Sequence, residues 1–453
     1  MTLDTAVRPS GEARSLPVYR HIPAFRRDLL GAISDMGIRA NGEIVRLDAK
    51  IFKPYLLTHP DHIQHVLRTN PQNYLRDSVF FRPLFRMFPQ GILGESEENW
   101  DFSRRSIQPM FTARHVQVMM ERLIELVNEG LDDAEEPART GTPMAVRHLM
   151  GSVVNKAIVG LIFGDRIPRQ KTDDLAVAAD TIVKTMVPRM VTPFFPGWFP
   201  RPGDRGFRKA VALFDETMKP LARERDVVEG QADMLSLLIG TPQPDGSEPT
   251  DSWLRDNYVG MYTAATETTA IALTWLWPAV AAHPEVLARL KAEVWEVVGD
   301  GPVAVEHIRK LVYTRQVIDE TLRWRPVVWL VTRGAEQDDV IGGVRIPKGA
   351  DVIISQWVTH RSPLFWDRPD EFDPDRFAPD APARNRYAYF PFGGGGHQCI
   401  GKELFLAEAV IVVASMLSRF DLVKIVPEDN FTPQLAATLR PKDEAYMTLK
   451  PRR

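Results

Sequence analysis

Hydrophobic side chains recur at helical spacing over most of the chain between about residue 60 and residue 300. The clearest stretch places its apolar residues on one helical face: Val116, Met119, Met120, Leu123, Ile124 and Val127. A second helical stretch follows the helix-start sequence at His283, Pro284 and Glu285. A third, from about 253 to 282, is apolar nearly all round, which predicts a helix that runs through the protein core.

Strand-like segments are short and flank this helical region. Residues 43–48 and 51–57 predict two strands joined by a turn. Later in the chain, glycine and proline split the segments 340–346 and 351–355, which predicts small hairpins, and a helix returns after Gly401. Residues 1–20 show no pattern and are expected to form a loose lead-in. The expected fold class is mainly α with a minor β region, in a single domain over 1–453.

Composition narrows the chemistry that this fold can carry. The 453 residues include only 1 cysteine, Cys399, so disulfides, zinc ribbons and iron–sulfur clusters are excluded. The thiol can act as a nucleophile or as a single metal ligand. Lys+Arg 56 against Asp+Glu 59 gives a net charge of −3, which argues against a nucleic-acid partner.

Targeting signals are not evident in the sequence. Residues 1–17 are mixed and polar, and the apolar run 268–282 is too short to span a membrane. We therefore expect a soluble, cytoplasmic protein with no transmembrane anchor.

The most informative stretch runs from Phe392 to Gly401 and holds four consecutive glycines before the single cysteine. Glycines let the backbone approach another group closely, and backbone N–H groups with a following helix N-terminus stabilise a thiolate. A flexible surface loop beside an inert, buried cysteine is the alternative. The full string fits F-x-x-G-x-x-x-C-x-G and resembles the haem-binding signature of the cytochrome P-450 family.

That resemblance implies roles for residues of the loop. Cys399 takes the position of the axial iron ligand, and Phe392, Gly395 and Gly401 match the signature. His397 stands where family members carry Arg or His in contact with a haem propionate.

Two further motifs resemble those of the family. Glu320 and Arg323 match the E-x-x-R helix motif, and Arg376 lies in a segment like the family's meander; together they imply a buried structural network. Trp100 and Arg104 match W-x-x-x-R and share a helix face, from which both can donate to a propionate. Arg333 matches the third propionate partner. Taken singly, each pair is also what a solvated helix face would show.

Polar residues interrupt the most apolar helix at Glu267 and Thr268, where hydroxyls can bond back to carbonyls one turn earlier. A surface stripe on a buried helix would look the same. The segment resembles the family's acid–alcohol motif, in which these two residues relay protons to iron-bound dioxygen. It departs from that motif at Ala265, where glycine is usual, and this methyl group puts the local helix geometry in question.

Residues around a substrate are also implied by the resemblance: Phe80, Phe81, Phe88, Ala264, Val328, Trp329, Leu330 and Ala437. For any one of them, ordinary core packing explains its apolar character as well. The aromatic, proline-rich run 191–200 is expected to be an entry lid, a membrane-touching loop or a loop packed on its own core.

The resemblance implies haem b as cofactor, O2 as co-substrate and electrons ultimately from NAD(P)H through a separate ferredoxin or flavodoxin with its reductase. The expected activity is hydroxylation or epoxidation of a hydrophobic small molecule, terpenoid, fatty acid or polyketide-like, by a monomer. A peroxide-driven or rearranging haem-thiolate enzyme is one alternative. A non-enzymatic haem-binding sensor is another.

Overall fold

The structure is a computed structural model. It describes these residues: 11–18, 28–50, 52–76, 88–95, 97–191, 199–224, 234–243, 246–427 and 432–452. The chain divides into two compact units. Unit 1 consists of Met1–Arg82, Val328–Glu371 and Pro382–Cys399, and unit 2 of Pro83–Val327, Phe372–Ala381 and Ile400–Arg453. The single domain expected over 1–453 stays a prediction.

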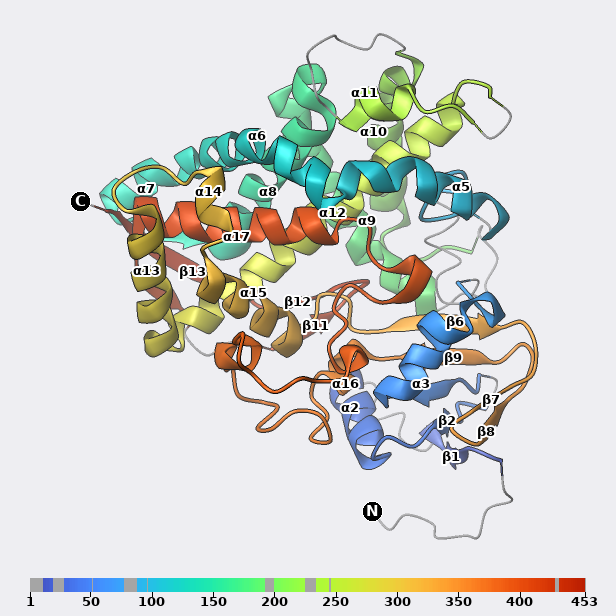
Figure 1. The fold of residues 1–453 in the computed structure, drawn as a ribbon. Coiled ribbons are helices and arrows are strands. Elements are labelled where there is room, and N and C mark those ends of the chain that lie inside the picture. Colours follow the sequence, from blue (N-terminus) through green and yellow to red (C-terminus); the bar gives the residue numbers. More distant parts are fainter. Residues whose placement is uncertain are drawn as a thin grey trace. The chain divides into compact units, whose positions relative to one another are not determined.

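Unit 1 is built on a six-stranded sheet in the order β1-β2-β3-β9-β6-β4. Its strands are β1 (Arg14–Leu16), β2 (Val45–Leu47), β3 (Tyr55–Leu57), β4 (Tyr74–Leu75), β6 (Val331–Ala335) and β9 (Asp351–Ile354). β1 and β2 are parallel, as are β3 and β9, and the other neighbours are antiparallel. Figure 1 shows the blue N-terminal strands and the orange later strands in this one sheet.

The expected strand pair near residue 50 is confirmed with shorter bounds, but two other expectations on strands were wrong. The lead-in contains β1, which pairs with β2. Segment 351–355 does not form a small hairpin, because β9 lies between β3 and β6. Val352 and Ile354 are fully buried there. β3 comes from a distant part of the chain, so the local pattern around 351–355 does not indicate that it pairs with β9.

The rest of unit 1 surrounds this sheet with short elements: α2 (Leu29–Arg39), α3 (Pro60–Gln64), η2 (His65–Thr69), η3 (Pro71–Asn73), β7 (Asp339–Ile341), β8 (Val344–Ile346), α16 (Gln356–Thr359), η8 (Arg386–Ala388) and η9 (Gly395–His397). β7 and β8 form the hairpin expected over 340–346.

Unit 2 is helical: α5 (Glu97–Ile107), η4 (Gln108–Phe111), α6 (Ala113–Leu131), η5 (Asp132–Ala134), α7 (Glu135–Thr140), α8 (Val146–Phe163), η6 (Gly164–Arg166), α9 (Arg169–Val191), α10 (Asp204–Arg223), α11 (Met234–Ile239), α12 (Asp251–Ala281), α13 (Pro284–Val298), α14 (Val305–Ile308), α15 (Val312–Trp324), η7 (Pro374–Phe377) and α17 (Lys402–Arg419). Two small sheets complete it, with strands β5 (Met144–Ala145), β10 (Phe420–Val426), β11 (Pro433–Leu435), β12 (Leu439–Pro441) and β13 (Tyr446–Pro451). The helices expected near 116–127, 253–282 and 286–297 and after Gly401 are therefore confirmed.

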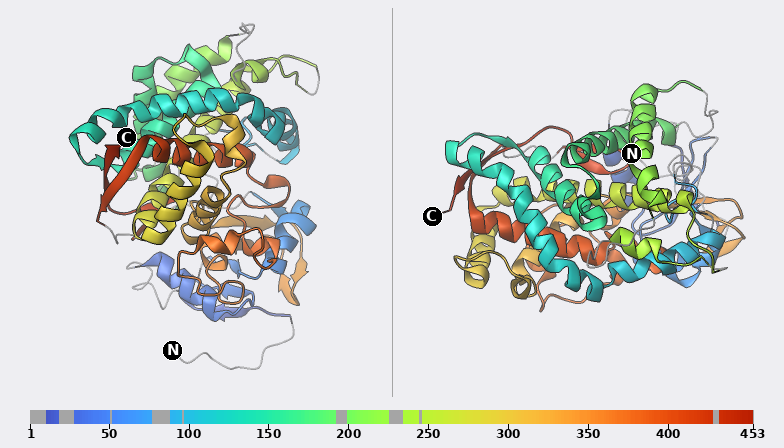
Figure 2. Two further views of the ribbon diagram at one scale, coloured as in Figure 1. Left: turned by 60° about the vertical axis from the view of Figure 1, so that its left-hand side comes forward. Right: turned by 90° about the horizontal axis from the view of Figure 1, so that it is seen from above.

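The core of unit 2 is organised around α12 and α17. α12 packs against α8, α10 and α15, and α17 packs against α6, α13 and α15. The red helix α17 lies beside α6 in Figure 1 and again in both views of Figure 2. Trp275 and Trp277 of α12 are fully buried, and their indole N–H groups donate to the Leu439 carbonyl at 2.9 Å and to the Met150 sulfur at 3.0 Å. Burial on nearly every side explains why α12 is apolar all round.

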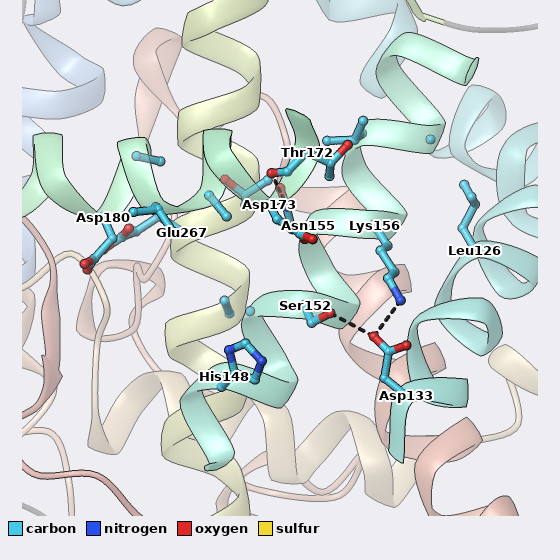
Figure 3. Close-up of a pocket in the computed structure, with 18 of the residues that line it drawn as sticks. Leu126, Asp133, His148, Ser152, Asn155, Lys156, Thr172, Asp173, Asp180 and Glu267 are labelled. Atoms are coloured by element: carbon cyan, nitrogen blue, oxygen red, sulfur yellow. Dashed lines mark hydrogen bonds and ion pairs between the residues drawn. The ribbon is translucent and has the colours of Figure 1, made fainter. Parts of the chain in front are cut away.

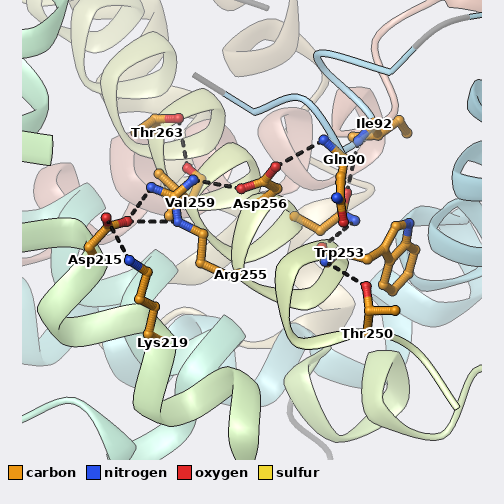
Figure 4. A network of polar contacts seen from close by, with 11 residues as sticks. Gln90, Ile92, Asp215, Lys219, Thr250, Trp253, Arg255, Asp256, Val259 and Thr263 are labelled. Atoms are coloured by element: carbon orange, nitrogen blue, oxygen red, sulfur yellow. Dashed lines mark hydrogen bonds and ion pairs between the residues drawn. The ribbon is translucent and has the colours of Figure 1, made fainter. Parts of the chain in front are cut away.

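A polar network fixes the N-terminal half of α12 to its neighbours (Figure 4). Arg255 donates to Asp215 of α10 at 2.9 Å and to Asp256 at 2.6 Å. Asp256 also accepts from the Gln90 backbone N–H at 2.9 Å. Thr250 caps the helix by accepting from the Trp253 N–H at 3.2 Å. These bonds hold the helix that carries the predicted acid–alcohol pair.

One described helical stretch, Val146–Arg166, is long and apolar enough to cross a membrane. Two thirds of its apolar window (67%) is buried within the structure, as in core helices of other proteins. It packs against α6 and α12, so its apolar character is accounted for by the core of unit 2.

Candidate active site

The cysteine loop belongs to unit 1 and closes on itself. The Cys399 backbone N–H donates to the Phe392 carbonyl at 2.9 Å, and η9 forms a turn between them. His397 ends that turn. Cys399 is exposed, so the alternative of a buried cysteine is wrong.

Gly395 ties this loop to the rest of unit 1. Its φ of +68° lies in the left-handed region, which favours glycine. A Cβ at this position would lie 1.6 Å from the Leu67 carbonyl oxygen, so the backbone approaches too closely for any other residue. The loop is therefore held against η2, and the glycine run fixes the thiol in place.

The donor set suits a haem iron. Among the described residues, no group of three or more His, Cys, Asp or Glu side chains could hold a metal ion. A single exposed thiol on a fixed loop cannot complete a zinc or iron–sulfur site. Such a thiol would be able to hold the iron of a haem, which needs few ligands from the protein.

The predicted propionate partners are divided between the units. In α5 of unit 2, Trp100 is buried, and the Arg104 guanidinium lies 5.8 Å from its ring centre. The two side chains therefore share one helix face, as their spacing predicts. Arg104 also donates to Gln108 at 3.0 Å. Arg333 lies in β6 of unit 1 and donates to the Thr332 carbonyl at 2.8 Å.

The structure brings the three members of the predicted charge network together in unit 2. Arg323 donates twice to Glu320, at 2.6 and 2.7 Å, and both side chains are fully buried. The Arg376 guanidinium lies 3.6 Å from Glu320, which also accepts from the Asp373 N–H at 2.8 Å. Burial raises the pKa of Glu320, and Arg323 opposes that rise. The surface-charge alternative is thus wrong.

Threonines of α12 bond back to the helix, as the sequence suggested. Thr266 donates to the Tyr262 carbonyl at 2.8 Å, and Thr268 donates to the Ala264 carbonyl at 2.7 Å. The helix nevertheless continues from Asp251 to Ala281 without a break. Ala264 is exposed and Thr268 is partly exposed, in a helix that is otherwise mostly buried. One turn apart, the two residues mark one accessible face of α12.

Glu267 points from a neighbouring face of α12 toward α9 and β12. Its carboxylate accepts from the Thr438 hydroxyl at 3.3 Å. Burial raises the pKa of Glu267 to about 7, Arg440 opposes the rise and Asp180 adds to it. Arg440 pairs with Asp180 at 2.8 Å. A pKa in the neutral range suits a group that both accepts and donates protons.

A cavity of about 820 Å³, lined in part by charged side chains, lies next to Glu267. Figure 3 shows Glu267 and Asp180 at one end of it, and Asp133 with its bonds to Ser152 and Lys156 at the other. The lining residues of α12 recur at helical spacing: Thr266, Glu267, Ala270, Ile271 and Thr274. Ala264 and Thr268 do not line it.

The predicted substrate-contacting residues lie in both units or outside the described residues. Phe80, Phe81 and most of the 191–200 run are outside them. Phe88 is 2% exposed and belongs to the interior of unit 2. Ala264 is exposed. The other four predicted residues are partly exposed: Val328, Trp329, Leu330 and Ala437. Their contact with a substrate stays a prediction.

Sequence reasoning missed Asp180, Arg440 and Thr438 around Glu267, and Glu408 of α17. The first three come from a helix and a C-terminal hairpin far from Glu267 in the chain, and nothing in their local patterns is unusual. Glu408 did carry a signal, because it is the one ionisable residue in the apolar stretch 404–417. An acid inside such a stretch indicates either a partner or a function.

Comparison with known proteins agrees with this geometry. The profile of the family "Cytochrome P450" matches residues 9–449. The chain is 29% identical to cyclooctat-9-en-7-ol 5-monooxygenase of Streptomyces melanosporofaciens, over 90% of this chain and 88% of that protein. It is 26% identical to pentalenene oxygenase of Streptomyces avermitilis, over 94% and 93%. The crystal structure of the cytochrome P450DA heme domain superposes with a TM-score of 0.85 at 24% identity, covering 98% of this chain and 99% of that one.

The chain belongs to the cytochrome P450 family. Its fold is the mainly helical P450 fold that the sequence predicted. It is a monooxygenase, an oxidoreductase that uses haem b, O2 and electrons derived from NAD(P)H. Such an enzyme works with a redox partner and on a hydrophobic substrate.

Proposed function

We propose that this P450 hydroxylates or epoxidises a terpenoid, with Cys399 as the iron ligand and with Glu267 and Thr268 as the proton-delivering pair. The observation that carries the mechanism is that Glu267 and Thr268 project from two different faces of α12. Glu267 has a pKa of about 7 and lies against a cavity that charged side chains line in part, and the adjacent Thr268 lies on the accessible face with Ala264.

Haem b, when bound, supplies the activation of O2 and the oxidising chemistry. Cys399 would hold its iron, and Trp100, Arg104, Arg333 and His397 would hold its propionates, since all four carry N–H donors. In this proposal Glu267 takes protons from water in the cavity and passes them to the Thr268 hydroxyl. The back-bond of Thr268 to Ala264 fixes that hydroxyl on the accessible face.

The terpenoid class rests on the relatives and on the lining. Two of the relatives are named for the oxidation of cyclooctat-9-en-7-ol and pentalenene. The residues predicted to surround the substrate are apolar, which favours a ligand held mainly by hydrophobic contact.

We further propose a separate ferredoxin or flavodoxin, with its reductase, as electron donor. The family profile matches residues 9–449, and an enzyme of this family works with a redox partner.

The first test is spectroscopic. The reduced protein with carbon monoxide bound should show the strongly red-shifted Soret band of thiolate-ligated haem, and Cys399→His should abolish that band. A wild type without the band would refute the assignment of Cys399.

The second test addresses substrate and electron source. Cyclooctat-9-en-7-ol and pentalenene should shift the haem spin state and be oxidised with NADPH, ferredoxin and ferredoxin reductase. A long-chain fatty acid serves as the comparison. Preferred turnover of the fatty acid would overturn the terpenoid class. Good turnover with hydrogen peroxide but none with the ferredoxin system would overturn the monooxygenase mechanism in favour of the peroxide-driven alternative.

A further inference from the structure

The hydrogen bonds of one carboxylate in unit 1 converge on the helical turn that contacts the cysteine loop. Asp339, the first residue of β7, accepts through its Oδ2 atom from three side chains: His65 at 2.8 Å, Asn70 at 3.1 Å and Tyr74 at 2.9 Å. Its Oδ1 atom accepts from the Val340 backbone N–H at 2.7 Å. Both oxygens of this carboxylate therefore have partners.

The carboxyl of Asp339 is ionised at neutral pH. Burial raises the pKa of Asp339, but the hydrogen bonds that it accepts outweigh burial and hold the pKa below its usual value. An ionised carboxylate only accepts hydrogen bonds, so the Nε2 atom of His65 carries the proton in this contact. Hydrogen bonds to an ionised acceptor are roughly twice as strong as neutral ones, so these bonds can hold a segment of backbone in place.

Two of the donors mark the ends of an unusual helical turn. η2 is a π-helical turn, in which the Asn70 backbone N–H donates to the His65 carbonyl five residues earlier, at 2.8 Å. The side chains of the same two residues donate to Asp339. Turns of this kind are rare and occur frequently at functional sites. Asp339 thus clamps both ends of the π turn.

The hairpin that carries Asp339 is itself packed against this part of unit 1. Ile341 of β7 is 2% exposed and belongs to a buried cluster that also contains Leu67 of η2. At the hairpin tip Gly342 has a φ of +54°, and a Cβ there would lie 2.3 Å from the Nε2 atom of His62 in α3. The carboxylate is therefore attached to a support that cannot move away from η2 without breaking this packing.

The π turn contacts the cysteine loop through its backbone. Leu67 lies in the middle of η2, and its carbonyl oxygen is the atom that a Cβ at Gly395 would approach to 1.6 Å. η2 also contacts η9, the turn between Phe392 and Cys399. In an ordinary α-helix the Asn70 N–H would bond to the carbonyl four residues earlier, and the carbonyls of this turn would shift. The position of the loop therefore depends on the π geometry of η2.

We propose that Asp339 is a positioning residue for the iron ligand: it holds η2 in its π geometry, and η2 holds the cysteine loop at Gly395 and thereby the direction of the Cys399 thiolate. The inference rests on the proposed role of Cys399. Groups behind a metal ligand fix its orientation, and their loss weakens the site. Without the clamp η2 relaxes toward α-helical geometry, the loop loses its support, and the thiolate leaves the iron faster.

The experiment removes the acceptor, one donor or a neighbouring charge. Asp339→Ala removes the carboxylate, and Tyr74→Phe removes one donor but keeps the ring. Asp338→Ala is the matched control. Asp338 is the adjacent residue and accepts from Arg345 at 2.7 Å and from the Lys348 backbone N–H at 2.8 Å, so these bonds stay within the segment 338–348.

Each holoenzyme is reduced under carbon monoxide at one temperature below its thermal midpoint. The rate at which the thiolate-type Soret band disappears is measured together with the far-ultraviolet signal of the helices. A residue that only stabilises the fold would change both signals together, whereas a residue that positions the thiolate changes the Soret band while the helices persist.

Asp339→Ala should speed the loss of the thiolate-type band about tenfold or more, because it removes several hydrogen bonds to a charged acceptor. Tyr74→Phe should speed it about two- to tenfold, since one of these bonds is lost. In the Asp339→Ala background Tyr74→Phe should add nothing, because the acceptor is already gone. Asp338→Ala should keep the wild-type rate, and the helical signal should stay constant in all variants.

A wild-type rate of band loss in Asp339→Ala would overturn the proposal, and so would an Asp338→Ala variant as fast as Asp339→Ala. Additive effects of Tyr74→Phe and Asp339→Ala, or band loss that only follows loss of the helical signal, would also overturn it. Failure of the proposed function looks different, because the wild type itself would then lack the thiolate-type band.

A second readout needs no haem band. Hydrogen–deuterium exchange of the backbone over residues 65–70 should be faster in Asp339→Ala and in Tyr74→Phe than in Asp338→Ala, because the π turn has lost its clamp. Equal exchange in the three variants would contradict the proposal. If Asp339→Ala does not retain haem, Tyr74→Phe and this exchange measurement decide the question.

Discussion

At the scale of single residues, ionisation and backbone conformation decide what the site can do. The carboxyl of Glu267 lies beside charged side chains from two other elements, and burial brings its pKa to about 7. An unperturbed Glu would be ionised at that pH and would rarely donate a proton. A pKa raised to about 7 would allow this acid to donate protons at neutral pH, as the proposed function requires.

Glu267→Gln should lower the rate of product formation about 100-fold or more, which is the lower end of the contribution of a positioned acid. In the wild type the protonated fraction falls as pH rises through about 7, so the rate should fall there too. The variant has no such group and should show a flat profile in that range. Rates of product formation measured between pH 6 and 9 test this. If the rate of the variant falls with rising pH as the wild-type rate does, another group causes the fall.

Gly395 and Gly393 allow a matched comparison of backbone strain and close packing. Both have positive φ, +68° and +70°, but a Cβ would clash with Leu67 at Gly395 and meet nothing at Gly393. Gly393→Ala should cost about 1–2 kcal/mol, the penalty of the left-handed region. Gly395→Ala should cost about 4 kcal/mol or more. The thermal midpoint and the amplitude of the carbon monoxide Soret band are measured for both variants. Equal losses of stability would show that the structure relieves the clash with Leu67 at position 395.

At the scale of elements, helices and strands bring charges to Glu267 that its own helix does not supply. Arg440 of β12 opposes the rise of its pKa, and Asp180 of α9 adds to it. Arg440→Met should therefore move the fall of activity with rising pH to a pH above 7, and Asp180→Asn should move it to a pH below 7. Thr274→Ala, on the cavity side of α12, should leave this fall in place. Shifts in the same direction for both variants would contradict this electrostatic account.

The Glu320–Arg323 pair links α15 to the segment after Phe372. Arg323→Leu should destabilise the protein by about 3–5 kcal/mol, because it leaves a buried carboxylate without its main partner. Asp375→Asn is the control, since Asp375 and Arg289 form an exposed pair at 2.8 Å, and its cost should stay below about 1 kcal/mol. Thermal midpoints of the holoenzymes test the difference. Similar losses in the two variants would mean that burial adds nothing to the pair.

At the scale of the whole molecule, Glu408 makes stability depend on pH. Its pKa is about 8 in the folded protein and 4.5 in the reference state, so the folded form binds more protons between these values. Stability therefore falls as pH rises from about 4.5 to 8, by up to ~5 kcal/mol at 1.36 kcal/mol per unit. The gap in thermal midpoint between Glu408→Gln and wild type should widen in favour of the variant from pH 5 to 8. A constant gap would show that Glu408 is ionised when folded.

The sequence determined the helical character of unit 2, the lone thiol and the order of the motifs. These follow from local signals: apolar spacing in α6 and α13, uniform apolarity in α12, and a glycine loop before Cys399. The pairs Trp100–Arg104 and Glu320–Arg323 were predictable for the same reason, since a helix brings residues three or four apart onto one face.

Only the tertiary structure decided which distant segments meet. The pairing of β9 with β3 and the arrival of Arg440 and Asp180 beside Glu267 join parts of the chain more than 80 residues apart. Such contacts depend on packing over the whole unit, and a local pattern carries no record of them. They shift the pKa of Glu267, so the residue types came from the sequence and the chemical state of this acid came from the fold.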